Sequence, residues 1–114
     1  DQVTALFEDP DATIALSAPS ILEAHARFQA RGRLDEFEEM LEMYRQLLSR
    51  IYPVDEPVAI RAVALRQGTT TRVPAIDTMI AATAAHHNAT LVHRDPHFAG
   101  LPAESVAQLS LVSR

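Results

Sequence analysis

The chain has 114 residues, a formal net charge of −5, 47% hydrophobic residues, 22% charged residues and no cysteine. A chain of this length is expected to form one domain with a single core. The lack of cysteine excludes disulfides, zinc–thiolate sites and cysteine nucleophiles, and it is compatible with a cytoplasmic location. The negative charge argues against nonspecific coating of nucleic acid, and no apolar run approaches the roughly 20 residues of a membrane helix.

The first half of the chain predicts three helices and two short strands. The helices are expected over residues 2–8, 19–30 and 34–49, and the strands over residues 13–17 and 51–54. Gly32 is expected to stop the second helix, and Pro53 places its strand at a sheet edge or marks the strand's end. The third helix is predicted because its apolar residues recur at intervals of three and four.

The second half continues the alternation of helices and strands. Helices are expected over residues 56–68 and 75–87, and strands over residues 89–92 and 108–112. Pro57 lies in the first turn of one helix, and Asn88 is a plausible stop for the other. Strands that alternate with helices predict an α/β fold, in which a parallel sheet is covered by helices on both faces.

Three acidic residues stand near the starts of predicted helices or the end of a predicted strand. Glu23 and Asp77 are each expected in the first turn of a helix, and Asp95 follows the strand over residues 89–92. In open α/β sheets, ligands bind beyond the carboxyl ends of the strands. If the strands are parallel neighbours, the three carboxylates face one end of the sheet. Their mutual repulsion then requires a cation, for which oxygen ligands favour Mg²⁺ or Mn²⁺.

Each acid also has an interpretation without a metal. Carboxylates near helix N-termini stabilise the helix dipole, and for Glu23 considered alone this is the stronger interpretation. Asp95 is able to start a turn with Pro96. Asp77 lies in a largely apolar segment, residues 75–80, where a purely solvated role is less favourable. Asp77 is therefore the strongest candidate of the three.

The segment PAIDTMIAATAAHHNATLVHRDPHF, residues 74–98, resembles the C-terminal signature of PIN-domain proteins, and most closely that of VapC-type toxins of bacterial toxin–antitoxin pairs. The shared pattern is an Asp that opens an Ala-rich helix, a short strand like ATLV, a polar triplet that ends in Asp or Asn, and an aromatic residue three positions later. The segment SAPSILEAHARF, residues 17–28, is similar to the second acidic motif of the family, with Glu23 in place. The resemblance covers nearly the whole chain.

The resemblance implies a PIN-like α/β fold and the activity of a metal-dependent endoribonuclease. It implies that Glu23, Asp77 and Asp95 are catalytic residues that bind one or two Mg²⁺ or Mn²⁺ ions, directly or through water. The metal would activate a water molecule for attack on an RNA phosphodiester. A cognate antitoxin and a second copy of the chain, in a homodimer, are the implied protein partners.

Two features depart from the family pattern. The family begins with a buried strand that ends in Asp followed by Thr or Ser, and no such strand precedes the helix expected over residues 2–8. We therefore expect one PIN-like domain over residues 1–114 that is incomplete at its N-terminus, without the first central strand and its acid. The second departure is His93, where the family commonly has a hydroxyl residue, together with His97, at a place that is often acidic.

Four residues are candidates for contacts with RNA phosphates: Arg27, Arg94, His93 and His97. Arg27 lies one helical turn beyond Glu23 and on the same helix face. For the arginines, surface ion pairs or contacts with an acidic tail of an antitoxin are equally compatible with the sequence. A zinc site is a weaker alternative, because the spacing of the four histidines between residues 86 and 97 matches no closed zinc site.

Most apolar residues of the helix over 34–49 are expected in the core. Some of them are also suited to a groove for an antitoxin helix, because methionine-rich surfaces adapt to partners: Met40, Met43, Tyr44, Leu47 and Leu48. The alternative to a nuclease is a non-catalytic PIN-like binding module that lost its first acidic ligand. A nuclease predicts divalent-dependent RNA cleavage, whereas the binding module predicts tight association with a partner without cleavage.

Overall fold

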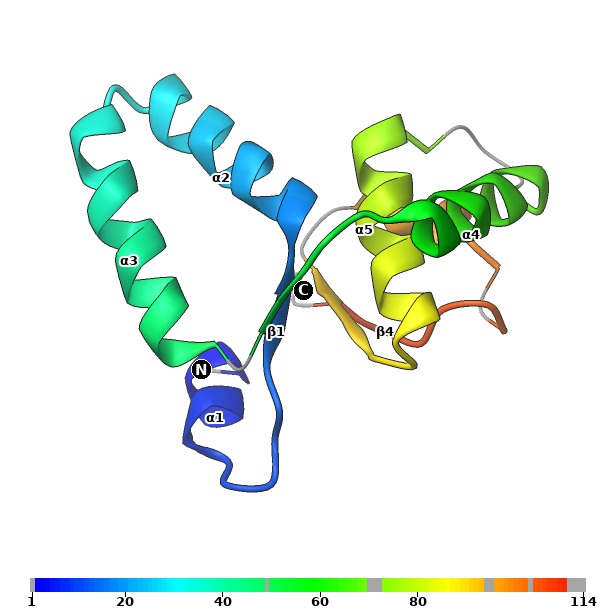
Figure 1. Cartoon of the computed structure of the whole chain (residues 1–114), viewed down its shortest axis with the longest axis horizontal. Coiled ribbons are helices and arrows are strands. Elements are labelled where there is room, and N and C mark those ends of the chain that lie inside the picture. Colours follow the sequence, from blue (N-terminus) through cyan, green and yellow to red (C-terminus); the bar gives the residue numbers. More distant parts are fainter. Residues whose placement is uncertain (1, 49, 70–72, 94–95, 103, 111–114) are drawn as a thin grey trace. The chain divides into compact units, whose positions relative to one another are not determined.

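The computed structural model of the chain describes residues 2–48, 50–69, 73–93, 96–102 and 104–110. Two compact units divide the chain, Asp1–Pro53 and Val54–Arg114. Each unit holds one pair of parallel strands together with helices (Figure 1). The predicted α/β class with parallel strand pairing is therefore confirmed.

The first unit is built on two short strands that pair in parallel. They are β1, Ala15–Ser17, and β2, Arg50–Tyr52, with Leu16 opposite Ile51. Helix α1, Gln2–Glu8, precedes β1; between the strands lie α2, Ala18–Ala30, the 3₁₀ helix η1, Leu34–Glu36, and α3, Phe37–Leu47. Parallel strands need such a long crossover, and here it is the hairpin of α2 and α3 (Figure 1).

Gly32 ends α2, as its position in the sequence predicted. Its φ of +67° lies in the left-handed region, which glycine adopts without the steric cost of a Cβ atom. The turn lets the Arg33 N–H donate to the Phe28 carbonyl at 2.9 Å, which satisfies a carbonyl of the helix end. The helix predicted over residues 34–49 is shorter than expected. It starts as η1, and Leu48 is extended, with ψ at 143°, where the chain turns toward β2.

The apolar residues of α3 are packed less deeply than the sequence predicted. The Phe37 ring contacts His25 edge-on, with ring centroids 5.0 Å apart, and Leu41 is buried. Met43 and Leu47, however, are 48% and 55% exposed. The expectation that most apolar residues of this helix enter the core is therefore wrong for the described residues. Within its unit, the helix packs against α2 and η1.

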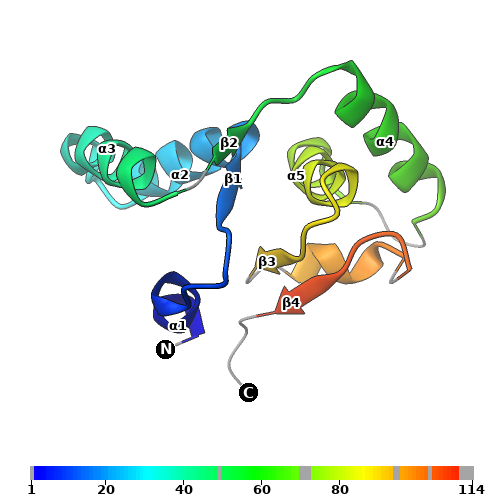
Figure 2. The ribbon, with the colours of Figure 1, turned by 60° about the horizontal axis from the view of Figure 1, so that its bottom comes forward.

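The second unit packs two helices against a second pair of parallel strands. Its elements in chain order are α4, Glu56–Gln67; α5, Ala75–His86; β3, Leu91–His93; the 3₁₀ helix η2, Pro96–Gly100; and β4, Gln108–Ser110. Strands β3 and β4 lie side by side (Figure 2), with Leu91 opposite Gln108 and His93 opposite Ser110. The 3₁₀ helix η2 was not predicted from the sequence.

Local signals set the ends of α4 and α5; Pro57 and Asn88 were predicted from the sequence, and the Asp55 cap was not. The Asp55 carboxylate accepts from the Val58 N–H at 3.2 Å and so caps the start of α4. Pro57 follows in the first turn, where its missing N–H costs nothing. At its C-terminus, α5 stops before Asn88, which takes a left-handed φ of +57°. The Ala89 N–H then donates back to the Ala84 carbonyl at 2.8 Å.

The main hydrophobic core of the described residues lies in this second unit. It is formed by Val58, Ala62, Leu65, Val73, Ala81, Ala82, Leu91, Phe98, Leu101 and Val106. The alanines of α5 have small side chains, which lets α4 pack closely against it. Phe98 anchors η2 in this core, and Leu91 anchors β3, which are the two elements that flank residues 94–95 in the chain. Among the described residues, no helix combines the length and the apolar character that a membrane span requires.

Candidate functional site

Asp77 lies in the first turn of α5, where the sequence predicted it. It is buried, with 7% of its surface exposed, and it belongs to the apolar helix that supplies two core alanines. The helix dipole favours a carboxylate at this place. Burial, however, also removes the hydration of the charge, which is costly unless charged or polar partners compensate. A buried carboxylate of this kind is a candidate for function.

The turn that carries Asp77 is held by its neighbour. Thr78 is 1% exposed, and its hydroxyl donates to the Pro74 carbonyl at 2.9 Å. Its backbone N–H donates to the same carbonyl, also at 2.9 Å. These two hydrogen bonds fix the first turn of α5, and they thereby restrict where the Asp77 backbone can be.

Glu23 is half-buried in α2, but it is not in the first turn as the sequence predicted. The helix begins at Ala18, directly after β1, so Glu23 is its sixth residue. The dipole effect acts mainly within the first turn, so it accounts less well for Glu23 than the sequence indicated. Arg27 lies one turn further along α2 and is exposed.

His93 is the last residue of β3, whereas the sequence placed it just beyond the strand. The strand reaches that far because His93 pairs with Ser110 of β4. Its Nε2 lies 2.9 Å from Gln108 Oε1, and its ring packs on Phe98 with centroids 4.7 Å apart. Its Nδ1 is buried and has no hydrogen-bond partner among the described residues. The His93 side chain is half-buried, and its predicted contact with RNA stays a prediction.

Gln108 completes this cluster, and the sequence did not single it out. Its side-chain Nε2 donates to the Phe98 carbonyl at 3.1 Å, so its amide contacts both His93 and the backbone of η2. Gln108 stands opposite Leu91 in the strand register, two positions before the partner of His93. Side chains two positions apart share a face of a sheet, which brings the two polar groups together. A polar residue at the start of the apolar run QLSLV is the sequence signal that points to it.

The remaining predicted residues are described less fully. Asp95 and Arg94 lie outside the described residues, and His97 belongs to η2. Glu23 and Asp77 belong to different compact units. Within the described ranges, no three His, Asp or Glu side chains gather as a cation site. The gathering of Glu23, Asp77 and Asp95 therefore stays a prediction.

The donor chemistry of Asp77 fits the divalent cation that the sequence resemblance implies. Carboxylate oxygen is the ligand that Mg²⁺ and Mn²⁺ prefer. The described residues alone do not complete such a site. The zinc alternative gains no support, because the rings of His86 and His87 meet edge-on, with centroids 5.0 Å apart, and no third ligand of the described chain joins them.

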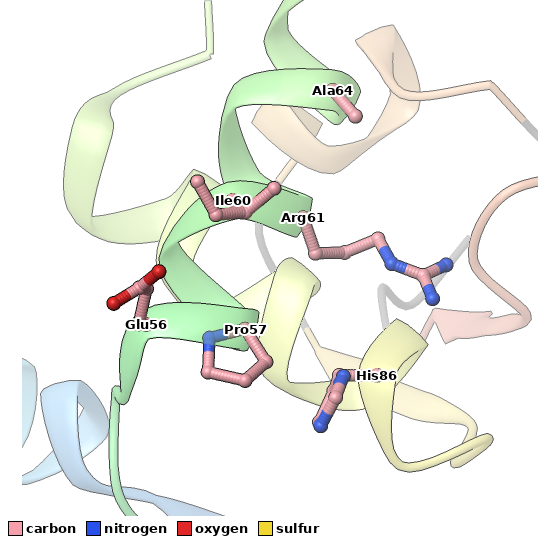
Figure 3. A pocket seen from close by; sticks show the side chains of 6 residues that line it. All are labelled: Glu56, Pro57, Ile60, Arg61, Ala64 and His86. Carbon is pink, nitrogen blue, oxygen red and sulfur yellow. The ribbon is translucent and has the colours of Figure 1, made fainter.

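A hollow of about 430 Å³ lies on the surface of α4 and the end of α5 (Figure 3). It is lined by Glu56, Pro57, Ile60, Arg61, Ala64 and His86. In Figure 3, Arg61 of α4 and His86 of α5 lie on one side of Pro57, and Glu56 lies on the other. Asp77, the predicted acid that the structure describes in this unit, is not among the residues that line the hollow.

A family model for the PIN domain matches residues 1–104. The chain belongs to the PIN domain family. Proteins of this family are generally nucleases, and the sequence resemblance to PIN proteins is therefore confirmed. No curated protein sequence matches the chain.

Three solved structures share the fold of the chain. The first is VapBC2 from Rickettsia felis bound to a DNA fragment from the VapBC2 promoter. Its TM-score is 0.74 and its identity 20%, and the match covers 96% of this chain and 81% of the VapBC2 chain. FitAB bound to an IR36 DNA fragment has a TM-score of 0.70 and 28% identity, over 91% and 74% of the two chains. FitAcB from Neisseria gonorrhoeae has a TM-score of 0.65 and 25% identity, over 96% and 93%. The likeness to VapBC2 shows the fold alone, and the predicted PIN-like fold is confirmed.

Proposed function

We propose that the chain is a metal-dependent endoribonuclease and the toxin of a VapBC-like toxin–antitoxin pair. The observation that carries this proposal is the buried carboxylate of Asp77 in the first turn of α5, within the part of the chain that matches the PIN family. A carboxylate withdrawn from water at a helix start is suited to binding a cation. The motif around Asp77 is also the part of the sequence that most closely resembles VapC-type proteins.

We further propose that Asp77, Asp95 and Glu23 hold Mg²⁺ or Mn²⁺, directly or through water. When bound, such an ion supplies a water of lowered pKa and stabilises charge on a phosphate. The chain's own residues hold the carboxylates in place, and Thr78 does so for Asp77 through the Pro74 carbonyl. Arg27, Arg94, His93 and His97 are the proposed contacts to RNA phosphates.

The test is the cleavage of a single-stranded RNA by the intact chain in the presence of Mn²⁺. Asp77→Asn removes the charge but keeps the shape, and we expect it to lower the cleavage rate by at least about a hundredfold, because a metal ligand is lost. Asp55→Asn is the matched control. Asp55 caps the neighbouring helix α4, and asparagine is an equally good N-cap, so this variant is expected to retain cleavage.

Either of two results would contradict the proposal. If Asp77→Asn retains the cleavage rate of the unchanged chain, Asp77 is not a ligand of the reacting metal. If the unchanged chain associates tightly with a partner but cleaves no RNA in Mg²⁺ or Mn²⁺, the non-catalytic binding module is the better description. Thermal unfolding of both variants checks that a loss of cleavage is not a loss of folding.

We propose that the antitoxin docks on the α2–α3 hairpin. Leu22 of α2 is 58% exposed, and Met43 and Leu47 of α3 are comparably exposed. The acidic side chains of Glu38 and Glu39 lie in the first turn of α3. An amphipathic antitoxin helix with basic flanking residues would cover the apolar side chains and pair with the acids.

A homodimer and a cytoplasmic location stay predictions of the sequence.

A further inference from the structure

Gln108 contacts both ends of the chain segment that runs from His93 to Phe98. One atom of its amide, Oε1, lies 2.9 Å from the ring nitrogen Nε2 of His93. The other, Nε2, donates to the backbone carbonyl of Phe98 at 3.1 Å. The segment between these contacts carries Asp95, the acid that the proposed function uses as a metal ligand. Gln108 itself lies on β4, outside the motif that resembles the PIN family.

These two contacts determine which nitrogen of His93 carries the proton. A carbonyl accepts hydrogen bonds and does not donate them, so the amide nitrogen of Gln108 faces Phe98. The amide oxygen therefore faces His93, and it accepts a hydrogen bond from the Nε2–H. A neutral imidazole has one N–H, so Nδ1 is left as an unprotonated acceptor. That Nδ1 is buried, and no described residue donates to it.

The amide of Gln108 also joins His93 of β3 to Phe98 of η2. The His93 end is additionally held by the strand pair with Ser110, and the Phe98 end by the packing of the two rings. Loss of the Gln108 amide would remove this contact of Phe98 with β4, whereas the strand pairing would still hold His93 to β4.

We propose that Gln108 is a positioning residue that fixes His93 in the Nε2–H tautomer and ties η2 to β4 through the Phe98 carbonyl. The link to the metal rests on the proposed function. The two contacts of the Gln108 amide, with His93 and with the Phe98 carbonyl, do not, and we call these two contacts the clamp. A glutamine is required because both atoms of its amide are used, one as acceptor and one as donor. Glutamate would retain the acceptor toward His93 and lose the donor toward Phe98, and methionine would lose both at similar length.

The first measurement is the tautomer of His93 by nuclear magnetic resonance of the intact chain labelled with ¹⁵N-histidine. At about pH 8.5, where free imidazole is neutral, we expect His93 to show a protonated Nε2 and an unprotonated Nδ1. His93→Asn identifies the signal. In Gln108→Met we expect a mixture of both tautomers and faster amide exchange in η2. Gln67→Met is the control, because Gln67 is an exposed glutamine at the end of α4 in the same unit.

Gln108→Glu separates the two contacts if the methionine variant folds poorly. We expect it to retain the proton on Nε2 of His93 and to show faster amide exchange in η2, because only the contact to Phe98 is lost. The clamp is wrong if the unchanged chain shows His93 protonated at Nδ1 or as an even mixture of tautomers. It is also wrong if Gln108→Met leaves the tautomer as it is in Gln67→Met.

The second measurement is Mn²⁺ binding by calorimetry. We expect Gln108→Met to weaken Mn²⁺ binding by about tenfold, as outer partners of metal sites do; Gln67→Met should not weaken it, and Asp95→Asn should bind far less. If Asp95→Asn loses binding but Gln108→Met does not, the positioning role is overturned and the proposed metal site stands. If Asp95→Asn binds as tightly as the unchanged chain, the proposed ligand set fails, and the tautomer still decides whether the clamp exists.

Discussion

Two threonine hydroxyls each donate a hydrogen bond to a backbone carbonyl of the preceding turn, but they do so in different surroundings. The Thr78 hydroxyl donates to the Pro74 carbonyl at 2.9 Å, and the Thr69 hydroxyl donates to the Arg66 carbonyl at 2.9 Å. Thr78 is 1% exposed, whereas Thr69 is only partly buried near the end of α4. Water can replace the bond at Thr69 but not at Thr78. The contribution of a hydrogen bond to stability depends on this difference.

We therefore expect Thr78→Val to lower the free energy of unfolding by about 1 kcal/mol, because the buried hydroxyl has no solvent alternative. Thr69→Val is expected to lower it by less than about 0.5 kcal/mol. Urea unfolding of the two variants beside the unchanged chain measures both values. Equal losses at the two positions would show that burial does not decide the strength of these bonds.

At the scale of an element, an ion pair between Arg33 and Glu36 spans the 3₁₀ helix η1, which leads into α3. The Arg33 guanidinium donates to both carboxylate oxygens of Glu36, with Nη2 and Oε1 2.6 Å apart. This hydrogen bonding, and then the charge of Arg33, lowers the pKa of Glu36 below its ordinary value of 4.5. The same carboxylate raises the pKa of Arg33. Both side chains are exposed, so the contribution of the pair to stability is small and sensitive to salt.

The lowered pKa of Glu36 fixes the sign of a pH dependence. A carboxylate with a lower pKa in the folded chain contributes stability above its unfolded pKa, and that contribution is lost as the pH falls through the folded value. We expect the unfolding temperature of the unchanged chain to exceed that of Glu36→Gln by a constant margin between about pH 6 and 7. That margin should shrink as the pH falls through the lowered pKa of Glu36 and disappear once Glu36 is protonated in the folded chain. A margin that grows as the pH falls would contradict this account.

Element ends that depend on local chemistry were predictable from the sequence. Gly32 and Asn88 stop their helices with a left-handed residue, and Asp55 caps α4, because each feature involves residues that are neighbours in the chain. Strand ends were less predictable. His93 joins β3 because Ser110 pairs with it, and nothing near His93 in the sequence indicates that partner.

The same contrast applies to the candidate site. The burial of Asp77 was predictable, because the residues around it in the sequence are apolar. The contact between Gln108 and His93 was not, because the two residues are 15 positions apart and depend on the strand register. The start of α2 at Ala18, which moves Glu23 out of the first turn, follows from the direct passage of β1 into the helix.

At the scale of the whole molecule, the described apolar residues are unevenly buried. Ten of them form the core of the second unit, and most of the described apolar residues of the first unit are exposed or partly buried. Exposed large apolar side chains occur in both units, with Leu22 and Leu47 in the first and Ile60 and Val63 in the second. Such side chains normally lie against a partner when they gather on one surface. The prediction of one domain over residues 1–114 stays a prediction beside this division into two units. The exposed apolar side chains of α2 and α3 support a proposed function in which a protein partner covers part of the first unit.

The net charge of −5 complicates any test of cation binding, because Mn²⁺ also relieves repulsion without a site. Two variants separate the effects. Asp77→Asn and Glu38→Gln each remove one negative charge, so both change the formal net charge from −5 to −4. Asp77 is buried in α5, whereas Glu38 is exposed on α3. General screening by Mn²⁺ would therefore act on the two variants alike, and a site at Asp77 would not.

A ligand that binds only the folded chain stabilises it by about 2.7 kcal/mol at a hundred times its dissociation constant. For a chain of 114 residues this raises the unfolding temperature by roughly 10 °C. We expect that shift for the unchanged chain and for Glu38→Gln, and only a small shift for Asp77→Asn, in thermal unfolding with Mn²⁺ at matched ionic strength. Equal shifts in all three proteins would mean that Mn²⁺ acts on the overall charge. A shift missing from Asp77→Asn alone would assign the binding energy to that carboxylate, because charge and ionic strength are the same in the control.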